Sequence, residues 1–173
     1  MELQKVYFFT ATIKSWVPLL DRKGFKEILV ESLNFLSKKD LIRIYGFVFM
    51  PNHIHLILEN IEMNGKEMPH ASFLKFTSHQ FLSKLRDTDP HALKIFRVSE
   101  SNKSHSFWQR DSLAIELFSE DVAIQKLNYI HNNPCQGKWM LAADPVDYYF
   151  SSYKYYESGI DRFGFLNHLG ERF

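Results

Sequence analysis

The feature that most constrains the fold is a pair of apolar runs on either side of a Pro-Asn dipeptide. "LIRIYGFVFM" occupies residues 41–50 and "HIHLILE" residues 53–59, and both are rich in β-branched and aromatic side chains. Pro51 and Asn52 favour a tight turn between the two runs. We therefore predict a β-hairpin over residues 41–59.

The second run of this hairpin carries two histidines, His53 and His55, at alternate positions. Side chains i and i+2 of a strand point to the same face, so the two imidazoles are predicted to lie side by side. Most isolated pairs of this kind only form hydrogen bonds, and that interpretation stays open. The second interpretation is metal binding, because imidazole is the commonest metal ligand in proteins. Two imidazoles do not complete a metal site, so a third donor is expected from elsewhere in the chain.

The rest of the chain alternates between the periods of strands and helices. In chain order the pattern predicts a strand at 5–14, helices at 21–40 and 68–87 on either side of the hairpin, a strand-like run at 106–118 and a helix at 119–133. The order β-α-β-β-α-β-α predicts an α+β fold, with a ferredoxin-like antiparallel sheet and helices packed mainly on one face.

Two further segments lack a clear period. Residues 88–104 are polar and end in "SESNKSHS", so we expect a mobile loop there. Residues 135–173 are irregular and rich in aromatic side chains, and we expect them to pack over the core. A chain of 173 residues without a linker rich in Pro, Gly or Ser is expected to form one domain over residues 1–173.

Composition excludes several classes of protein. The single cysteine, Cys135, rules out an intramolecular disulfide framework and a zinc site of several cysteines. No apolar run is long enough for a membrane span, and the first residues lack the layout of a signal peptide, so a cytoplasmic protein is expected. The net charge of +1 gives no global basic field, so binding of nucleic acid would need local contacts. Aromatic residues, 16% of the chain, could fill a core or stack on unpaired bases.

The helix predicted at 119–133 offers a candidate partner for the histidine pair. Its apolar stripe consists of Ala123, Ile124, Leu127 and Ile130. Tyr129 and Asn133, four residues apart, fall together on a different side of the helix. A tyrosine so placed is ordinarily a boundary residue of an amphipathic helix. Beside a metal pair, however, Tyr129 is a candidate nucleophile towards a phosphodiester, and Asn133 is a candidate third ligand.

Other arrangements of chemical groups are weaker. Glu59 shares the strand face of His55 by parity, as an iron site of two histidines and one carboxylate would need, but it lies about 13 Å further along the strand. A nucleophilic Cys135 lacks a supporting pattern. The sequence has no glycine-rich loop that could cradle phosphates, which excludes nucleotide hydrolysis of the P-loop type.

Four segments in this order resemble the HUH-type single-tyrosine transposases, in the branch associated with repetitive extragenic palindromes (REP). They are "MPNHIHLIL" at 50–58, "FWQRDSLAIELF" at 107–118, "LNYIHNNPCQGKW" at 127–139 and "DPVDYYFSSYKYY" at 144–156. The resemblance implies a metal-dependent single-stranded DNA endonuclease and strand transferase that cleaves near hairpins. It also implies single-stranded or hairpin DNA as the partner, and a monomer or homodimer.

The resemblance further implies roles for particular residues. His53 and His55 match the histidines that hold Mg²⁺ or Mn²⁺, and Asn133 matches a helix residue that helps to bind the metal. Tyr129 matches the tyrosine that attacks the scissile phosphate and forms a 5′-phosphotyrosine intermediate. For DNA binding we expect basic side chains and one stacking aromatic: Lys75, Lys84, Arg86, Lys103, Arg110 and Trp108.

Two rival functions stay open at this point. One is a domesticated protein that binds DNA hairpins without turnover. The other is a small-molecule metalloenzyme that uses the histidine pair. Each basic side chain named for DNA binding is also compatible with an ordinary solvated charge.

Overall fold

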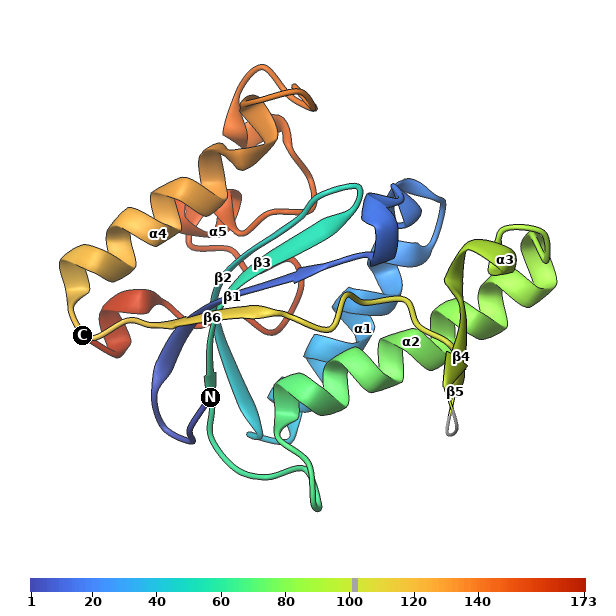
Figure 1. Cartoon of the computed structure of the whole chain (residues 1–173). Helices are drawn as coiled ribbons and strands as arrows, with labels where there is room; N and C mark the ends of the chain where they lie inside the picture. Colours follow the sequence, from blue (N-terminus) through green and yellow to red (C-terminus); the bar gives the residue numbers. More distant parts are fainter. Residues whose placement is uncertain (101–102) are drawn as a thin grey trace.

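A four-stranded antiparallel sheet forms the centre of the fold (Figure 1). The computed structural model describes residues 1–100 and 103–173, with only the backbone of Glu100 and Lys103. The strands of the sheet are β1 (Val6–Thr12), β2 (Ile42–Phe49), β3 (His53–Asn60) and β6 (Leu113–Glu116), in the order β2-β3-β1-β6. Each neighbouring pair is antiparallel, which confirms the predicted α+β, ferredoxin-like class.

The predicted hairpin is present as β2 and β3. The backbone N–H of Met50 donates to the carbonyl of His53 at 2.9 Å and closes the turn that contains Pro51 and Asn52. The register pairs Phe49 with Ile54, and it shifts by one residue at a bulge between Ile44 and Gly46 of β2. Ile44 and Phe47, three residues apart, therefore face the same core, whereas β3 keeps its alternation and places Ile54 and Leu56 there.

Two long helices, α1 (Phe25–Lys38) and α2 (Pro69–Thr88), cover one face of the sheet (Figure 1). Phe9 and Phe47 of the sheet are fully buried beneath them. Two short 3₁₀ helices, η1 (Lys14–Trp16) and η2 (Leu19–Asp21), connect β1 to α1.

The opposite face is covered by α4 (Glu120–Asn132) and by parts of the C-terminal segment. Ser119 caps this helix, because its hydroxyl accepts a hydrogen bond from the N–H of Val122. The sheet therefore has helices on both faces, with the two long helices α1 and α2 on one of them, whereas the sequence predicted helices mainly on one face. The apolar stripe of α4 shows that it covers a surface, but the local pattern does not say which one.

Glycine at position 46 allows α4 to lie close to the sheet. A Cβ at Gly46 would stand 2.6 Å from Cδ1 of Leu127, closer than side-chain atoms pack. Leu127 belongs to the apolar core between α4 and the sheet, which also contains Ile57 of β3. This contact fixes the height of α4 above β2 and β3.

The segment expected to be a mobile loop, 88–104, contains regular structure, and this expectation is corrected. It holds a short helix α3 (Leu93–Phe96) and the strands β4 (Arg97–Glu100) and β5 (Lys103–His105), while residues 101–102 lie outside the described part of the chain. The reason is Phe96, which is fully buried and stacks on Phe107 with ring centroids 4.6 Å apart. Phe96 and the buried Ala92 together anchor this stretch to the core.

The strand-like run at 106–118 is only partly a strand. Its regular part, β6, pairs with β1 alone and forms an exposed edge of the sheet. Ahead of β6, Trp108 forms an isolated bridge with Ile13, and the N–H of Gln109 donates to the carbonyl of Thr12 at 2.8 Å. The run therefore follows the end of β1 before it joins the sheet.

The C-terminal segment contacts the core through aromatic side chains. Its short elements are η3 (Asn133–Cys135), η4 (Pro145–Asp147), α5 (Tyr153–Ser158) and η5 (Leu169–Glu171). Phe163 and Phe165 insert beside Phe47, with ring centroids 4.9 and 5.4 Å from it. No helix in the described part of the chain is long and apolar enough to span a membrane.

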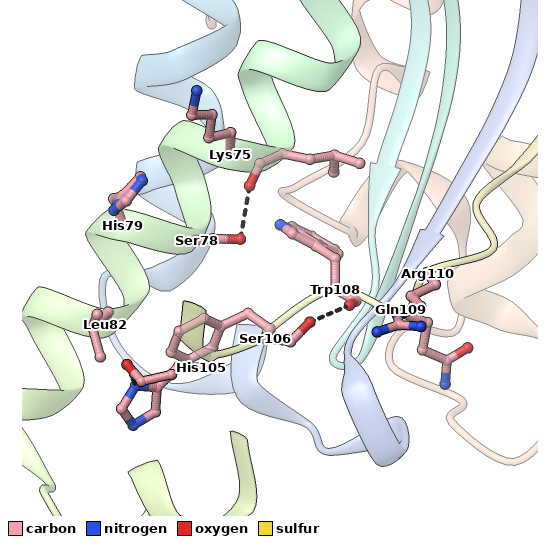
Figure 2. Close-up of a pocket in the computed structure, with 12 residues that line it drawn as sticks. Lys75, Ser78, His79, Leu82, His105, Ser106, Trp108, Gln109 and Arg110 are labelled. Carbon is pink, nitrogen blue, oxygen red and sulfur yellow. Dashed lines mark hydrogen bonds between the residues drawn. The ribbon is translucent and has the colours of Figure 1, made fainter. Parts of the chain in front are cut away.

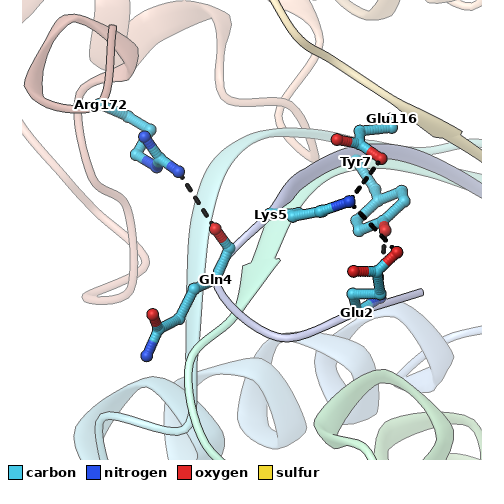
Figure 3. Close-up of polar contacts among 6 residues, drawn as sticks. All are labelled: Glu2, Gln4, Lys5, Tyr7, Glu116 and Arg172. Carbon is cyan, nitrogen blue, oxygen red and sulfur yellow. Dashed lines mark hydrogen bonds and ion pairs between the residues drawn. The ribbon is translucent and has the colours of Figure 1, made fainter.

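Polar contacts join both chain ends to the start of β1 (Figure 3). Lys5 forms ion pairs with Glu2 at 3.1 Å and with Glu116 of β6 at 3.2 Å. Arg172 donates to the carbonyl of Gln4 at 3.1 Å. These contacts lie at the end of β1 away from His53 and His55, which pair with Thr12 and Thr10 at its other end.

Candidate active site

The sheet places the two histidines as predicted. His53 and His55 lie opposite Thr12 and Thr10 of β1, and their ring centroids are 4.8 Å apart. Phe8, two residues before Thr10, stacks on the His55 ring at 5.3 Å. The pair thus sits at one end of the two central strands, on the face that α4 covers.

His55 presents a buried nitrogen without a partner. Its Nδ1 lies 2.7 Å from the hydroxyl of Thr10, while its Nε2 is buried and has no hydrogen-bond partner among the described residues. Burial lowers the pKa of His55 to about 3, and the positive charges of His53 and Lys126 act in the same direction. The imidazole is therefore neutral at pH 7, the form that binds metals. If Nδ1–H donates to Thr10, the lone pair of Nε2 is left for a ligand.

The tautomer of His53 follows from its neighbour. The side chain of Asn52 contacts the Trp16 carbonyl through Nδ2 at 3.1 Å and His53 Nδ1 through Oδ1 at 2.7 Å. A carbonyl only accepts, so the amide must turn Nδ2 towards Trp16 and Oδ1 towards His53. Nδ1 of His53 therefore carries the proton, and its Nε2 carries a lone pair. Burial lowers the pKa of His53 to about 4, although a hydrogen bond with Asn133 acts in the opposite direction.

Helix α4 brings Tyr129 and Asn133 to the same place. The Tyr129 ring packs edge-on against His55, with centroids 5.3 Å apart, and against Phe8 at 5.9 Å. Tyr129 remains 47% exposed, so it is not a core residue. Tyr129 and Asn133 line one cavity of about 420 Å³ together with His53 and His55. All four predicted site residues thus meet in the structure.

Several residues of this cavity were not predicted from the sequence. Its lining also includes Thr10, Thr12, Trp16, Gln136, Gly137 and Trp139. Lys126 lies close by, with Nζ 5.0 Å from the centre of the Phe8 ring and 6.0 Å from that of Tyr129. Lys126 could have been found from its position three residues before Tyr129 on the same helix face. Trp16 carried no local signal, because only the tertiary fold brings η1 to β3.

The donor atoms fit a divalent cation. Nε2 of His55 is buried and has no hydrogen-bond partner in the part of the chain that the structure describes, and Nε2 of His53 carries a lone pair next to Asn133. Residues 1–100 and 103–173 contain no group of three or more His, Cys, Asp and Glu side chains that could hold a metal. The candidate donor set here is two imidazoles and one carboxamide, which would leave further positions on a divalent cation for water or a phosphate oxygen.

The structure favours neither the alternative ligand Glu59 nor the alternative nucleophile Cys135. The buried carboxylate of Glu59 accepts hydrogen bonds from the hydroxyl of Tyr45 at 2.7 Å and from Nε of Arg172 at 3.2 Å. Burial raises the pKa of the Cys135 thiol, and the acidic Asp144 and Asp147 act in the same direction. A raised pKa disfavours the nucleophilic thiolate.

The residues predicted to bind DNA do not form one cluster. Lys75 and Arg110 line a larger cavity of about 680 Å³ between α2 and residues 104–110, shown in Figure 2. Lys84 lies over the Phe25 ring at 5.8 Å, and neither it nor the exposed Arg86 lines that cavity. The side chain of Lys103 is outside the described residues.

The expected stacking role of Trp108 is corrected. This side chain is only 6% exposed, and its indole N–H donates to the hydroxyl of Thr77 on α2 at 3.0 Å. Its ring packs against Phe81 with centroids 5.8 Å apart. Trp108 therefore anchors residues 104–110 to α2 (Figure 2). The strand-like run around Trp108 does not show by itself whether this side chain faces the core or the solvent.

Comparisons with known proteins bear on the fold. No family model matches the chain, and no curated protein matches it. Among solved structures, the chain is similar to a REP-associated tyrosine transposase bound to a REP hairpin. The identity is 16%, the TM-score is 0.60, and the match covers 97% of this chain and 88% of that one. A candidate transposase from Deinococcus radiodurans R1 is 19% identical over 76% of this chain and 92% of that chain. Its TM-score of 0.40 is too low to show a shared fold.

The first of these matches extends over nearly the whole chain, from β1 to the C-terminal segment. At 16% identity it bears on the backbone arrangement, not on the chemistry of individual side chains. The protein therefore has the fold of a REP-associated tyrosine transposase.

Proposed function

We propose that the protein is a metal-dependent single-stranded DNA endonuclease and strand transferase that acts beside DNA hairpins. The observation that carries this proposal is the contact between the exposed Tyr129 and His55, whose buried Nε2 has no partner among the described residues. A phenol next to two neutral imidazoles places a candidate nucleophile beside candidate ligands of a cation, which supports a tyrosine nucleophile assisted by a metal.

The proposed reaction uses Tyr129 as the nucleophile. Its phenolic oxygen attacks the phosphorus of a phosphodiester, and the bond from phosphorus to the 3′ oxygen breaks. The phenol loses its proton to solvent, and the departing oxygen takes up a proton to become a 3′-hydroxyl. The 5′ phosphate stays linked to Tyr129. Because one phosphodiester replaces another, the 3′-hydroxyl of a second strand can reverse the attack and join the two strands without an external energy source.

The other residues of the cavity assist this step. His53, His55 and Asn133 would hold the cation, which supplies neutralising charge at the phosphate oxygens when bound. The hydroxyl of Thr10 and the amide of Asn52 keep the two imidazoles oriented. Lys126 adds a positive charge beside the Tyr129 ring, where it would help to neutralise the negative charge of the phosphate under attack.

For the DNA partner, the solved transposase of similar fold is bound to a REP hairpin, and we propose the same class of partner here. Lys75, Lys84, Arg86 and Arg110 are the proposed phosphate contacts. The net charge of +1 suits recognition of a folded hairpin by particular contacts better than a coating of DNA by a basic surface.

The test is the formation of a covalent protein–DNA adduct. Hairpin oligonucleotides with single-stranded flanks, labelled at the 3′ end, are incubated with the protein and Mn²⁺ or Mg²⁺ and analysed under denaturing conditions. The 3′-labelled fragment should shift to the mobility of the protein, and EDTA should prevent the shift. A 5′ label should instead reveal a free fragment with a 3′-hydroxyl.

Two variants sharpen the assay. Tyr129→Phe should form no adduct, whereas Tyr149→Phe, which alters another exposed tyrosine remote from the cavity, should behave as wild type. Binding of the hairpin without an adduct under every metal condition would favour the rival function, a hairpin-binding protein without turnover. An adduct formed equally well by Tyr129→Phe would refute the proposed nucleophile.

A further inference from the structure

Trp16 stands at the edge of the candidate active site with its side chain unburied. It is 58% exposed, yet it lines the cavity that holds His53 and Tyr129. Its ring centroid lies 6.3 Å from that of His53, in an edge-on arrangement. The other two tryptophans differ from it, since Trp108 is buried and Trp139 is half-buried.

The backbone that presents Trp16 is unusual. Ser15 and Trp16 both have φ of 57°, in the left-handed region that costs non-glycine residues about 1–2 kcal/mol each. The conformation is held by the N–H of Trp16, which donates to Ile13, and by Asn52, which donates to the Trp16 carbonyl at 3.1 Å. The fold thus maintains a disfavoured turn whose result is an indole that stays 58% exposed at the edge of the cavity.

Asn52 ties this turn to the histidine pair. The same buried amide that holds the Trp16 carbonyl also orients His53. The position of the indole is therefore coupled to the position of the imidazole. Trp139, from the segment that follows α4, adds a second indole to the same cavity.

We infer that Trp16, with Trp139 as a second wall, forms a subsite for an unpaired nucleobase next to the scissile phosphate. This inference rests on the proposed function, because a base becomes a ligand here only if single-stranded DNA enters the cavity. An indole face stacks on any base, whatever its hydrogen-bonding edge, so the subsite favours unpaired over paired DNA more than one sequence over another. A stacked base would hold its phosphate beside His53 and Tyr129.

The first test measures binding without catalysis. Hairpin oligonucleotides with single-stranded thymidine flanks are titrated in EDTA, where no cleavage occurs, against wild type, Trp16→Ala and Trp16→Phe. Trp16→Ala should weaken binding about 5- to 150-fold, the range that the loss of one stacked base gives, and Trp16→Phe should retain most of the affinity. Phe35→Ala is the matched control, because Phe35 is an aromatic of similar exposure, 55%, on α1 and outside the cavity.

The second test locates the base. Abasic sites are placed one at a time along the flank; at the stacked position, wild type and Trp16→Ala should bind with equal affinity. Single 5-iodouracil substitutions should photo-crosslink to Trp16 or Trp139 at that position, as mapped by mass spectrometry. Equal binding by Trp16→Ala and Phe35→Ala, or cross-links only to other residues, would overturn the inference.

These outcomes are distinct from a failure of the proposed function. If wild type forms no covalent adduct but the base binds at Trp16, the subsite stands and the strand transferase proposal falls. If wild type forms the adduct while Trp16→Ala binds and reacts like Phe35→Ala, the subsite falls alone.

Discussion

Asn52 is the residue through which a single substitution should disturb the candidate metal site most specifically. Its side chain is 1% exposed and forms two hydrogen bonds, one from His53 Nδ1–H and one to the Trp16 carbonyl. Asn52→Ala removes both and leaves the donor on His53 without a partner. The imidazole then loses the contact that fixes its tautomer and its ring orientation.

The expected magnitudes follow from these two bonds. Loss of the partner of a metal-binding histidine weakens metal affinity about 10- to 100-fold. A buried polar group left without a partner costs about 1–3 kcal/mol in the free energy of unfolding. We therefore expect Asn52→Ala to fold, to lose about 2 kcal/mol of stability, and to bind Mn²⁺ about 10- to 100-fold more weakly.

The assay is calorimetric titration of Mn²⁺ into the DNA-free protein, with urea denaturation of the same samples. Asn52→Asp keeps an acceptor for His53 and should bind Mn²⁺ far better than Asn52→Ala. Asn34→Ala is the control for a lost amide, since Asn34 donates to the carbonyl of Phe163 at 2.9 Å in another part of the fold. It should lose stability without losing affinity for Mn²⁺.

Two results would refute this reasoning. If Asn52→Ala binds Mn²⁺ as wild type does, then either His53 is not a ligand or its orientation does not depend on Asn52. If Asn52→Asp binds Mn²⁺ as weakly as Asn52→Ala, removal of the acceptor for His53 Nδ1–H is not the cause of the lost affinity.

Three further predictions concern packing, pH and catalysis. Gly46→Ala places a methyl group against Leu127, so it should cost about 1–3 kcal/mol in urea denaturation and slow adduct formation by displacing α4; unchanged stability would contradict the seating of α4 on Gly46. Burial lowers the pKa of His70 to about 4, so on acidification the unfolded chain takes up a proton at a higher pH than the folded chain does. The free energy of unfolding should therefore fall as the pH drops from about 6.5 towards 4. Urea denaturation at pH 7 and pH 4 measures this fall, and His70→Gln should make it smaller by on the order of 1 kcal/mol. If the variant loses as much stability as wild type between the two pH values, His70 is not a buried neutral imidazole. Lys126→Ala should slow adduct formation about 10-fold with less effect on hairpin binding, whereas Lys126→Arg should retain the rate; equal rates for wild type and Lys126→Ala would remove Lys126 from the site.

The local patterns in the sequence predicted the parts of the site that depend on one element at a time. The alternation in β3 predicted that His53 and His55 are neighbours, and the helical period predicted that Asn133, the residue directly after α4, lies on the same side as Tyr129. Both follow from fixed geometric periods, so they need no knowledge of the rest of the chain.

The contacts between elements could not be read in the same way. Thr10 lies beside His55 only because β1 pairs with β3 in one particular register, and Trp16 reaches the cavity only through the turn that follows. Trp108 was expected to stack on DNA, and Phe96 fell in a segment expected to be a mobile loop, yet both side chains are buried. Whether an aromatic residue faces the core or the solvent is decided by tertiary packing, which the neighbouring residues along the chain do not encode.

The central claim, that Tyr129 is the nucleophile of a DNA strand transferase, is tested most directly by mapping the covalent linkage. Wild-type protein is allowed to react with a hairpin substrate in Mn²⁺, the adduct is digested with protease and nuclease, and the modified peptide is sequenced by mass spectrometry. Of the eight tyrosines in the chain, Tyr129 alone should carry the 5′-phosphate. A phosphate on another residue, or complete cleavage of the substrate without any linked peptide, would contradict the account.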